Sequence, residues 1–193
     1  TTATPPVEQG ENDVTSSNYT SGTTARPKGV MLTHRNVYIN AYNFIAHLGI
    51  RHEDVELWTL PMFHANGWTF TWIVTAVGGT HVCLRKVEPS KVYELISAER
   101  ITMLCAAPTV LIALANADPA VRASAPRGIR VVTAGAPPAA ATIRTIEEGL
   151  GWAVTHVYGL TETAPFITVC EPRPEHDTLD MADLARIKAR QGV

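Results

Sequence analysis

The sequence is poor in cysteine, in runs of positive charge and in long apolar stretches, and each shortage argues against a class of protein. Its three cysteines, Cys83, Cys105 and Cys170, form no CxxC pair, so neither a disulfide framework nor a zinc knuckle is indicated. We therefore expect reduced thiols and a cytoplasmic location. A formal net charge of −2 without a long Lys/Arg run argues against nucleic acid as a partner. No apolar run approaches the roughly 20 residues of a membrane span, so we expect no transmembrane segment.

The sequence does contain enough apolar material for one globular core, since 46% of its 193 residues are hydrophobic and 18% are charged. Residues 1–13 are polar and contain prolines, so we expect a linker or disordered edge there and order from Val14 onward. After the first loop, the apolar spacing predicts a helix with Thr33 as its N-cap and Gly49 as its C-terminal stop.

Short apolar runs alternate with helical segments along the rest of the chain. The runs are LWTL at 57–60, HVCL at 81–84, MLCA at 103–106, RVVT at 130–133 and AVTHVY at 153–158. This alternation predicts an α/β fold, a doubly wound and mainly parallel five-stranded sheet flanked by helices. Ligands in such folds bind outside the carboxyl ends of the strands. The candidate binding loops therefore follow Leu60, Ala106, Thr133 and Tyr158.

The segment YTSGTTARPKG, Tyr19 to Gly29, has the parts of a phosphate-binding loop. Backbone N–H groups of glycine-rich turns converge on phosphate oxygens, Ser and Thr hydroxyls add donors, and Lys28 supplies a positive charge. A Walker loop needs Gly-Lys-Ser/Thr, whereas Lys28 follows Pro27, so the segment does not belong to that class. A solvated linker is the alternative interpretation of this segment taken alone.

No other catalytic pattern is present in the sequence. It contains neither G-x-S-x-G nor G-x-G-x-x-G, and its seven histidines lack metal-ligand spacing. Asp177, Asp180 and Asp183 precede or begin the helical segment MADLARIKARQ. Acidic residues are expected at a helix start, and we favour that role over a metal site.

Four segments, in order, resemble the motifs of the adenylate-forming (AMP-binding) superfamily, and of its fatty acyl-CoA synthetase branch in particular. TSGTTARPKG resembles the family's phosphate loop, and LPMFHANGW at 60–68 resembles its acyl-substrate segment. TAGAPP at 133–138 resembles the turn beside adenine, and VYGLTETAP at 157–165 resembles the Tyr-Gly-x-Thr-Glu motif.

The resemblance covers residues 14–193 and implies a partial AMP-binding domain, the central part of the family's large N-terminal domain. It implies a phosphate loop at 19–29, a parallel α/β core at 56–158 and a C-terminal helical tail at about 179–191.

The resemblance also implies a nucleotide site. The residues implied for the β- and γ-phosphates of ATP are Thr20, Ser21, Gly22, Thr23, Thr24 and Lys28. Those implied for adenine and the adjoining nucleotide are Gly135, Ala136, Pro137, Tyr158 and Gly159. Thr161 would hydrogen-bond the α-phosphate, and Glu162 would hold Mg²⁺, a hard cation that prefers carboxylate oxygen.

For the second substrate, the resemblance implies a carboxylic acid of the medium- to long-chain fatty class. His64 would lie by its carboxylate and Trp68 would gate the acyl channel, although a core role for Trp68 fits the pattern equally well. For Phe70 and Trp72 we favour a core role, because bulky apolar residues are usually buried.

The implied reaction joins the carboxylate to ATP, giving acyl-adenylate and pyrophosphate, after which coenzyme A displaces AMP. The implied catalytic residues are Lys28, His64, Thr161 and Glu162. Positioning and electrostatic stabilisation would supply most of the catalysis.

Three departures from the family's pattern bear on activity. Ala25 stands where the common loop has glycine. The segment DVTSSNY is polar for the buried strand that normally feeds the loop, so we expect that strand to be frayed or at a sheet edge. The ribose-binding aspartate and the lobe with the adenylating lysine are missing, so we expect the isolated chain to be inactive. An aryl- or amino-acid ligase and a non-catalytic nucleotide-binding module stay open as alternatives, and so does a homodimer of the parent protein.

Overall fold

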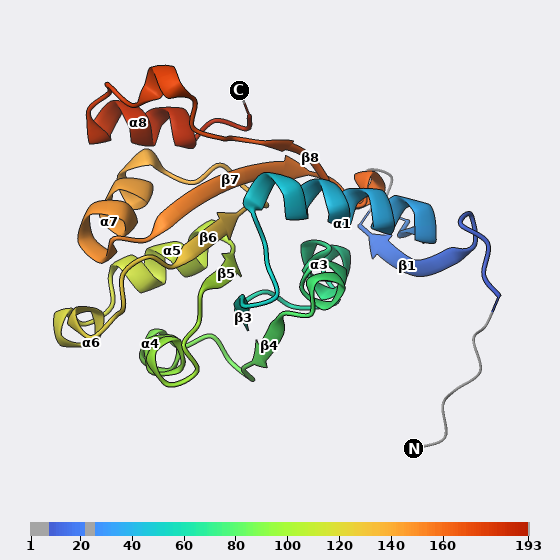
Figure 1. Cartoon of the computed structure of the whole chain (residues 1–193), viewed down its shortest axis with the longest axis horizontal. Coiled ribbons are helices and arrows are strands. Elements are labelled where there is room, and N and C mark those ends of the chain that lie inside the picture. Colours follow the sequence, from blue (N-terminus) through green and yellow to red (C-terminus); the bar gives the residue numbers. More distant parts are fainter. Residues whose placement is uncertain (1–7, 22–25, 193) are drawn as a thin grey trace.

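The computed structural model describes residues 8–21 and 26–192, whose course is shown in Figure 1. Part of the expected linker, residues 1–7, lies outside the described residues, and so does Val193. The same holds for four residues of the expected phosphate loop, Gly22, Thr23, Thr24 and Ala25. The described chain forms a six-stranded sheet with helices on both faces, and a separate two-stranded hairpin.

The main sheet confirms the predicted α/β fold. Its strands are β3 (Val55–Trp58), β4 (Thr80–Cys83), β5 (Met103–Ala106), β6 (Arg130–Thr133), β7 (Ala153–Gly159) and β8 (Phe166–Val169). They lie in the order β4-β3-β5-β6-β7-β8, and the first five pair in parallel as predicted. The sixth strand, β8, was not predicted and runs antiparallel to β7. An antiparallel neighbour needs no crossover helix, so a short turn after β7 is sufficient.

Local signals set the ends of several helices. The helices are α1 (His34–Leu48), α2 (Ala65–Trp68), α3 (Phe70–Val77), α4 (Pro89–Ala98), α5 (Pro108–Ala115), α6 (Pro119–Ala123), α7 (Ala140–Leu150), α8 (Met181–Lys188) and the 3₁₀ turns η1 (Thr161–Thr163) and η2 (Pro174–His176). The predicted N-cap of α1 is confirmed, because Asn36 donates its backbone N–H to Thr33 Oγ1 at 3.2 Å. Gly49 ends α1 in the left-handed conformation, as predicted. No helix in the described part of the chain combines the length and apolarity of a membrane span.

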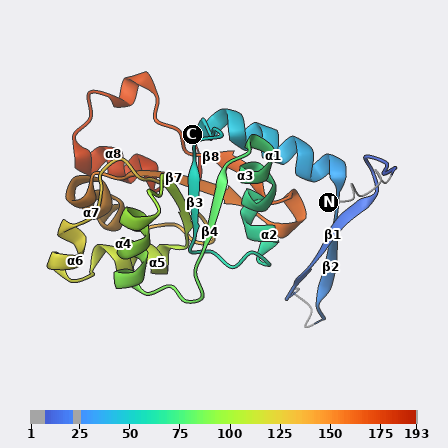
Figure 2. The ribbon, with the colours of Figure 1, turned by 60° about the horizontal axis from the view of Figure 1, so that its bottom comes forward.

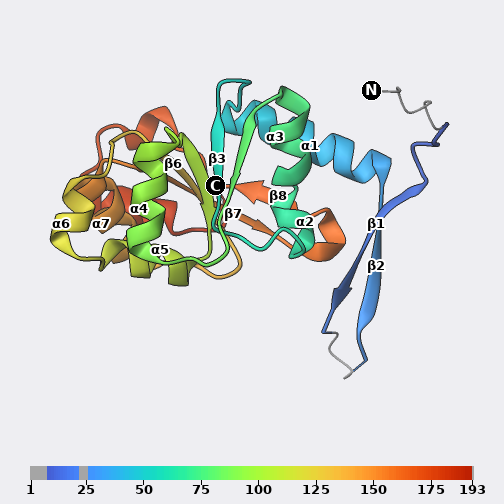
Figure 3. The same ribbon diagram turned by 90° about the horizontal axis from the view of Figure 1, so that it is seen from below.

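Alternate residues of the strands point to opposite faces of the sheet and divide the core in two. Leu57 and Leu104 pack against α4, α5 and α7, and we call this side the α5 face. Trp58 and Cys105, the next residues along the same strands, pack on the other side against α1 and α3, and we call that side the α3 face. Figure 3 shows these two groups of helices on either side of the strands.

The two remaining strands, β1 (Val14–Thr20) and β2 (Lys28–Thr33), form an antiparallel hairpin outside the main sheet. Figures 2 and 3 show the hairpin projecting from the rest of the fold. The expected edge position is confirmed, since β1 pairs on one side only, whereas fraying is not found because pairing extends along β1 with one irregularity between Val14 and Ser16. Thr20 lies opposite Lys28, so the hairpin holds the two ends of the expected phosphate loop side by side.

Candidate functional site

A cavity of about 440 Å³ lies where the loops after β3, β6 and β7 meet the hairpin. Nine residues expected from the sequence line it: Thr20, Ser21, Lys28, His64, Trp68, Gly135, Gly159, Thr161 and Glu162. They belong to four segments that are far apart in the chain. Three of these segments follow the carboxyl ends of parallel strands, where a doubly wound sheet is expected to bind ligands.

Three other expected residues do not line this cavity. Ala136 and Pro137 are exposed in the loop after β6, next to Gly135, whose φ is +90°. Tyr158 is 36% exposed on β7. Gly22, Thr23 and Thr24 lie outside the described residues. The roles expected for all of the site residues stay predictions.

The segment after β7 folds back tightly because Gly159 has no side chain. A Cβ added at Gly159 would lie 2.0 Å from the carbonyl oxygen of Pro165, closer than any real contact. The free space lets Leu160 donate its N–H to that oxygen at 2.9 Å. The returning loop presents Thr161 and Glu162 to the cavity. The Glu162 side chain is exposed, and the ion pairs among the described residues do not include it.

The backbone after His64 is left-handed over five consecutive residues. The φ angles are +41° at Ala65, +46° at Asn66, +58° at Gly67, +53° at Trp68 and +68° at Thr69. We call Ala65–Thr69 the left-handed turn; it includes α2. A non-glycine residue in this conformation costs about 1–2 kcal/mol, so the turn persists only because its surroundings hold it. The sequence did not predict it, since Ala65, Trp68 and Thr69 give no signal for positive φ.

Asn66 is a site residue that the sequence analysis missed. Its side-chain oxygen accepts hydrogen bonds from Ser16 Oγ at 2.8 Å and from Asn18 Nδ2 at 2.6 Å. Both donors lie on β1, and Asn18 is only 8% exposed. These contacts explain why DVTSSNY is polar, because its inward side chains bind a polar residue of the turn. That unexplained polarity was the signal that could have pointed to a partner.

Two aromatic rings form a buried part of the cavity wall. Trp68 and Phe166, both cavity-lining, are 4% and 6% exposed, and their ring centroids lie 6.0 Å apart with an interplanar angle of 70°. Phe166 also packs against Phe44, with centroids 4.4 Å apart. Trp68 is therefore both a core residue and a wall of the cavity, so its two interpretations are compatible. Phe70 is fully buried, as the core interpretation predicted.

A buried acid lies on the α3 face without lining the cavity. Glu56 on β3 is fully buried, and Cys105 donates its backbone N–H to Glu56 Oε1 at 3.2 Å. Burial raises the pKa of Glu56 to about 8, so the carboxyl group is mostly protonated at neutral pH. Burial, with Glu56 beside it, raises the pKa of the Cys105 thiol as well.

Asp54, two residues earlier on the same side of the chain, behaves in the opposite way. Burial acts to raise the pKa of Asp54, but hydrogen bonds from Arg130, the Arg51 backbone and Thr102 outweigh it and lower the pKa. The two carboxyl groups therefore differ because three hydrogen-bond donors, one of them a guanidinium, favour the charged form of Asp54, whereas burial dominates at Glu56.

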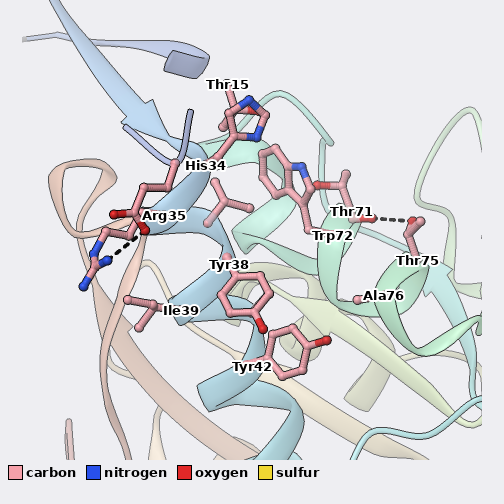
Figure 4. A pocket seen from close by; sticks show the side chains of 13 residues that line it. Thr15, His34, Arg35, Tyr38, Ile39, Tyr42, Thr71, Trp72, Thr75 and Ala76 are labelled. Atoms are coloured by element: carbon pink, nitrogen blue, oxygen red, sulfur yellow. Dashed lines mark hydrogen bonds and ion pairs between the residues drawn. The ribbon is translucent and has the colours of Figure 1, made fainter. Parts of the chain in front are cut away.

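A second cavity, of about 780 Å³, lies between α1 and α3 (Figure 4). Tyr38 and Tyr42 of α1 lie along it with ring centroids 4.5 Å apart, and Trp72 of α3 faces it. Arg35 forms an ion pair with Glu11 at 2.9 Å at its rim. None of the residues expected to form the site lines this cavity, so its aromatic walls are separate from the candidate site.

Side chains that could hold a metal ion are few. Within residues 8–21 and 26–192, no group of three or more His, Cys, Asp and Glu side chains gathers as metal ligands would. Asp180 caps α8 by accepting the Asp183 backbone N–H at 2.8 Å, and Asp183 pairs with Arg186. This agrees with the helix-start role favoured from the sequence. A metal ion at the cavity would have Glu162 as its carboxylate.

Comparison with known proteins assigns the chain to a family. The profile of the family described as "AMP-binding enzyme" matches residues 2–185. The chain is 46% identical over 179 residues to the 2-methylpropanoate–CoA ligase CCL4 of Humulus lupulus, covering 91% of this chain and 31% of that protein. It is 44% identical over 176 residues to the peroxisomal trans-cinnamate:CoA ligase of Petunia hybrida, again covering 91% of this chain and 31% of that protein. The chain thus spans about a third of the length of these relatives.

Solved structures give the same answer for the fold. The N-terminal domain of FACL13 from Mycobacterium tuberculosis matches with a TM-score of 0.81 at 28% identity, over 97% of this chain and 44% of that one. ATP-bound MatB from Rhodopseudomonas palustris matches with a TM-score of 0.75 at 29% identity, over 86% of this chain and 33% of that one.

Proposed function

This chain belongs to the family of AMP-binding enzymes, and from that premise we propose that it forms the part of an acid–CoA ligase in which ATP meets a carboxylic acid. The observation that carries the proposal is the cavity of about 440 Å³, to which all four motif-like segments contribute. The names of the two relatives, both acid–CoA ligases, support it. The activity proposed is that of the whole protein, because the chain spans about a third of these relatives.

Thr20, Ser21 and Lys28 would hold the leaving phosphates of ATP. Their placement supports this role, since Thr20 and Lys28 are paired across the hairpin and all three line the cavity. Hydroxyl donors and an ammonium group strengthen hydrogen bonds to phosphate oxygens, because the acceptor is charged. Thr161 would donate to the α-phosphate from the opposite wall. Donors that are already in place need no reorganisation as charge develops.

Glu162 would hold Mg²⁺, and the residues at the cavity fit that ion. Mg²⁺ keeps several waters and binds one or two carboxylates together with substrate phosphates, so a full protein cage is not required. One exposed carboxylate that faces the cavity, without an ion-pair partner among the described residues, matches this need. When bound, the ion would neutralise charge on the phosphates.

His64 and Trp68 would receive the acid, and we propose a short-chain or aryl acid. The relatives' names, a 2-methylpropanoate ligase and a trans-cinnamate ligase, favour these classes. The cavity also supports a small acid, because its wall includes the buried rings of Trp68 and Phe166. The medium- to long-chain fatty acid expected from the sequence has no support in these names.

The chain's own residues would act by position and charge. Lys28 and Thr161 would stabilise the phosphate charge while the acid, oriented beside His64, attacks the α-phosphorus; holding two reactants together replaces a bimolecular encounter. Coenzyme A would then take the acyl group. The AMP-binding family description and the ATP-bound relative support the nucleotide, and coenzyme A rests on the relatives' names.

Location and assembly stay predictions. In the structure Cys105 and Cys170 are buried, Cys83 is exposed and all three are free. Free thiols suit a reducing compartment such as the cytoplasm, whereas one relative is named as peroxisomal. The homodimer expected for the parent protein also stays a prediction.

Calorimetry on the intact protein that contains this chain tests the nucleotide role, with Glu162→Gln compared against Glu148→Gln. Glu148 lies exposed on α7, away from the cavity, and makes only a 3.9 Å ion pair with Arg144. We expect Glu162→Gln to weaken ATP binding about tenfold in the presence of Mg²⁺ and little in its absence, since one carboxylate ligand is lost. Glu148→Gln should bind as wild type. Absence of Mg²⁺-dependent ATP binding in the wild-type protein would refute the proposal.

Pyrophosphate exchange with 2-methylpropanoate, trans-cinnamate and dodecanoate tests the acid class. We expect exchange with at least one of the first two and little with dodecanoate. Exchange confined to dodecanoate would overturn the short-chain or aryl assignment and restore the expectation drawn from the sequence.

A further inference from the structure

The left-handed turn is the point where three walls of the cavity are joined. Asn66 Oδ1 accepts hydrogen bonds from Ser16 and Asn18 of the hairpin. Three residues later, Thr69 Oγ1 donates to the carbonyl oxygen of Ala164, at the end of the loop that carries Thr161, at 2.8 Å. The turn itself follows His64 directly. One strained segment therefore contacts the hairpin on one side and the loop after β7 on the other.

Asn66 provides the polar side-chain anchorage of β1. β1 pairs only with β2, and neither strand joins the main sheet. Among the described residues, the side-chain hydrogen bonds that β1 makes beyond the hairpin all go to Asn66. Asn18 also donates to Ser16 Oγ at 3.3 Å, so the three side chains form one partly buried cluster. On the β2 side, Leu32 is buried against Val37 and Ala164, so the hairpin has an apolar contact there and a polar contact with Asn66 on the β1 side.

We infer that Asn66 is a positioning residue that sets the distance between the phosphate-holding end of the hairpin, at Thr20 and Lys28, and the acid-holding segment at His64. This inference rests on the proposed function for the identity of the two substrates, but the anchorage itself does not. Asn66 touches neither reacting group and would act through the hairpin. Asn is also among the residues that adopt positive φ most readily, so a purely conformational role must be separated from the anchoring role.

Two substitutions at Asn66 separate these roles. Asn66→Gly keeps the backbone free to adopt positive φ and removes the acceptor oxygen. Asn66→Asp keeps an acceptor at the same place and also tolerates positive φ. If the residue acts as an anchor, glycine should loosen the hairpin and aspartate should not. Ser17→Ala is the matched control on β1, because Ser17 is exposed and points to the opposite face from Ser16 and Asn18.

Hydrogen exchange of the β1 and β2 backbone amides is the first measurement, made on the intact protein that contains this chain. We expect about tenfold faster exchange in Asn66→Gly, the effect of losing about 1.4 kcal/mol of hydrogen bonding, and wild-type exchange in Asn66→Asp and Ser17→Ala. Asn18→Ala removes one of the two hydrogen bonds that Asn66→Gly removes, so it should give a smaller acceleration and add little to Asn66→Gly. Equal behaviour of the glycine and aspartate variants, in either direction, would overturn the inference.

Pyrophosphate exchange kinetics form the second measurement and separate this inference from the proposed function. For Asn66→Gly we expect kcat to fall roughly tenfold and the KM for ATP to rise, while Asn66→Asp restores both, because a shifted hairpin misplaces both substrates. A variant that merely unfolds more easily would keep wild-type kinetics per folded molecule. If the wild-type protein shows no exchange with any acid, the proposed function fails, and hydrogen exchange still decides whether Asn66 anchors the hairpin.

Discussion

The two faces of the main sheet share the same strands but differ in what they contain. On the α5 face, aliphatic side chains such as Leu104 and Ile146 are fully buried against right-handed helices. The α3 face is rich in aromatic rings such as Trp58 and Phe166, and it also contains the left-handed turn and the buried carboxyl group of Glu56. The face that borders the cavity therefore contains most of the non-glycine residues with positive φ, although Arg100, between α4 and β5, is another.

This difference explains how the fold accommodates a strained turn beside the cavity. Each fully buried aliphatic side chain contributes about 1.5–3 kcal/mol, so the α5 face can offset the cost of a strained turn on the other side. Strained residues at functional sites persist when the surrounding structure holds them. Substitutions on the two faces should therefore differ in how they change the free energy of unfolding, its dependence on pH or hydrogen exchange in the hairpin. We make three predictions from this contrast and begin with the largest expected effect.

A matched pair of glycine substitutions should separate the faces most clearly. Gly159→Ala places a Cβ 2.0 Å from the Pro165 carbonyl oxygen, so the loop after β7 must move, and we expect a loss of about 3 kcal/mol in the free energy of unfolding. Gly149→Ala, on an exposed turn of α7 with nothing within 4 Å, should instead stabilise by about 0.5–1 kcal/mol. Urea unfolding of both variants measures this. A Gly159→Ala variant as stable as wild type would contradict the tight return of the loop.

The second prediction concerns pH and the buried carboxyl group. The pKa of Glu56 is raised from 4.5 to about 8 in the folded state, so between these values the folded protein holds a proton that the unfolded chain has lost. The stability contribution is therefore complete below about pH 4.5 and is lost as pH rises towards 8, at up to about 1.4 kcal/mol per pH unit.

Glu56→Gln removes this titration and should flatten the dependence of unfolding free energy on pH between about 5 and 8. Tyr93→Phe on the α5 face is the control, because it removes the hydrogen bond from Tyr93 Oη to the Leu114 carbonyl oxygen without changing a group that titrates in this range. It should lower stability by about 1 kcal/mol at every pH in the window. If the slope of unfolding free energy against pH is unchanged in Glu56→Gln, the buried carboxyl group is not the source of the pH dependence.

The same contrast explains what the sequence could predict. The five parallel strands, and the N-cap of α1 at Thr33, depend on neighbours a few residues away and on apolar runs, so local patterns were sufficient. Nine of the expected site residues line one cavity, and they could be named in advance because they belong to recognisable motifs. The parallel strands were predicted from their alternation with helical segments, and strand β8 (Phe166–Val169) was missed because it follows β7 antiparallel and without a crossover helix.

The features that escaped prediction are held by contacts between distant parts of the chain. Positive φ at Trp68 and Thr69 follows from support by other segments, which no pattern in their own residues reveals. The acceptor role of Asn66 depends on Ser16, 50 residues away. Polarity in DVTSSNY was visible in the sequence, but its partner was not, because pairing between a strand and a turn has no fixed spacing.

The smallest expected effect comes from replacing two helix caps, one beside the α3 face and one beside the α5 face. Thr33 caps α1 beside the α3 face, and Asp180 caps α8, whose Ala185 packs into the core of the α5 face. Replacing either with alanine should cost about 1 kcal/mol in urea unfolding, since each loses one bond to a backbone N–H.

The two variants should differ in hydrogen exchange of the hairpin, because Thr33 is also the last residue of β2 and joins the hairpin to α1. Thr33→Ala should therefore speed hydrogen exchange in β2, whereas Asp180→Ala should leave the hairpin unchanged. Equal exchange in the two variants would mean that the hairpin is held by its own pairing, by the packing of Leu32 and by Asn66, with no contribution from the Thr33 cap.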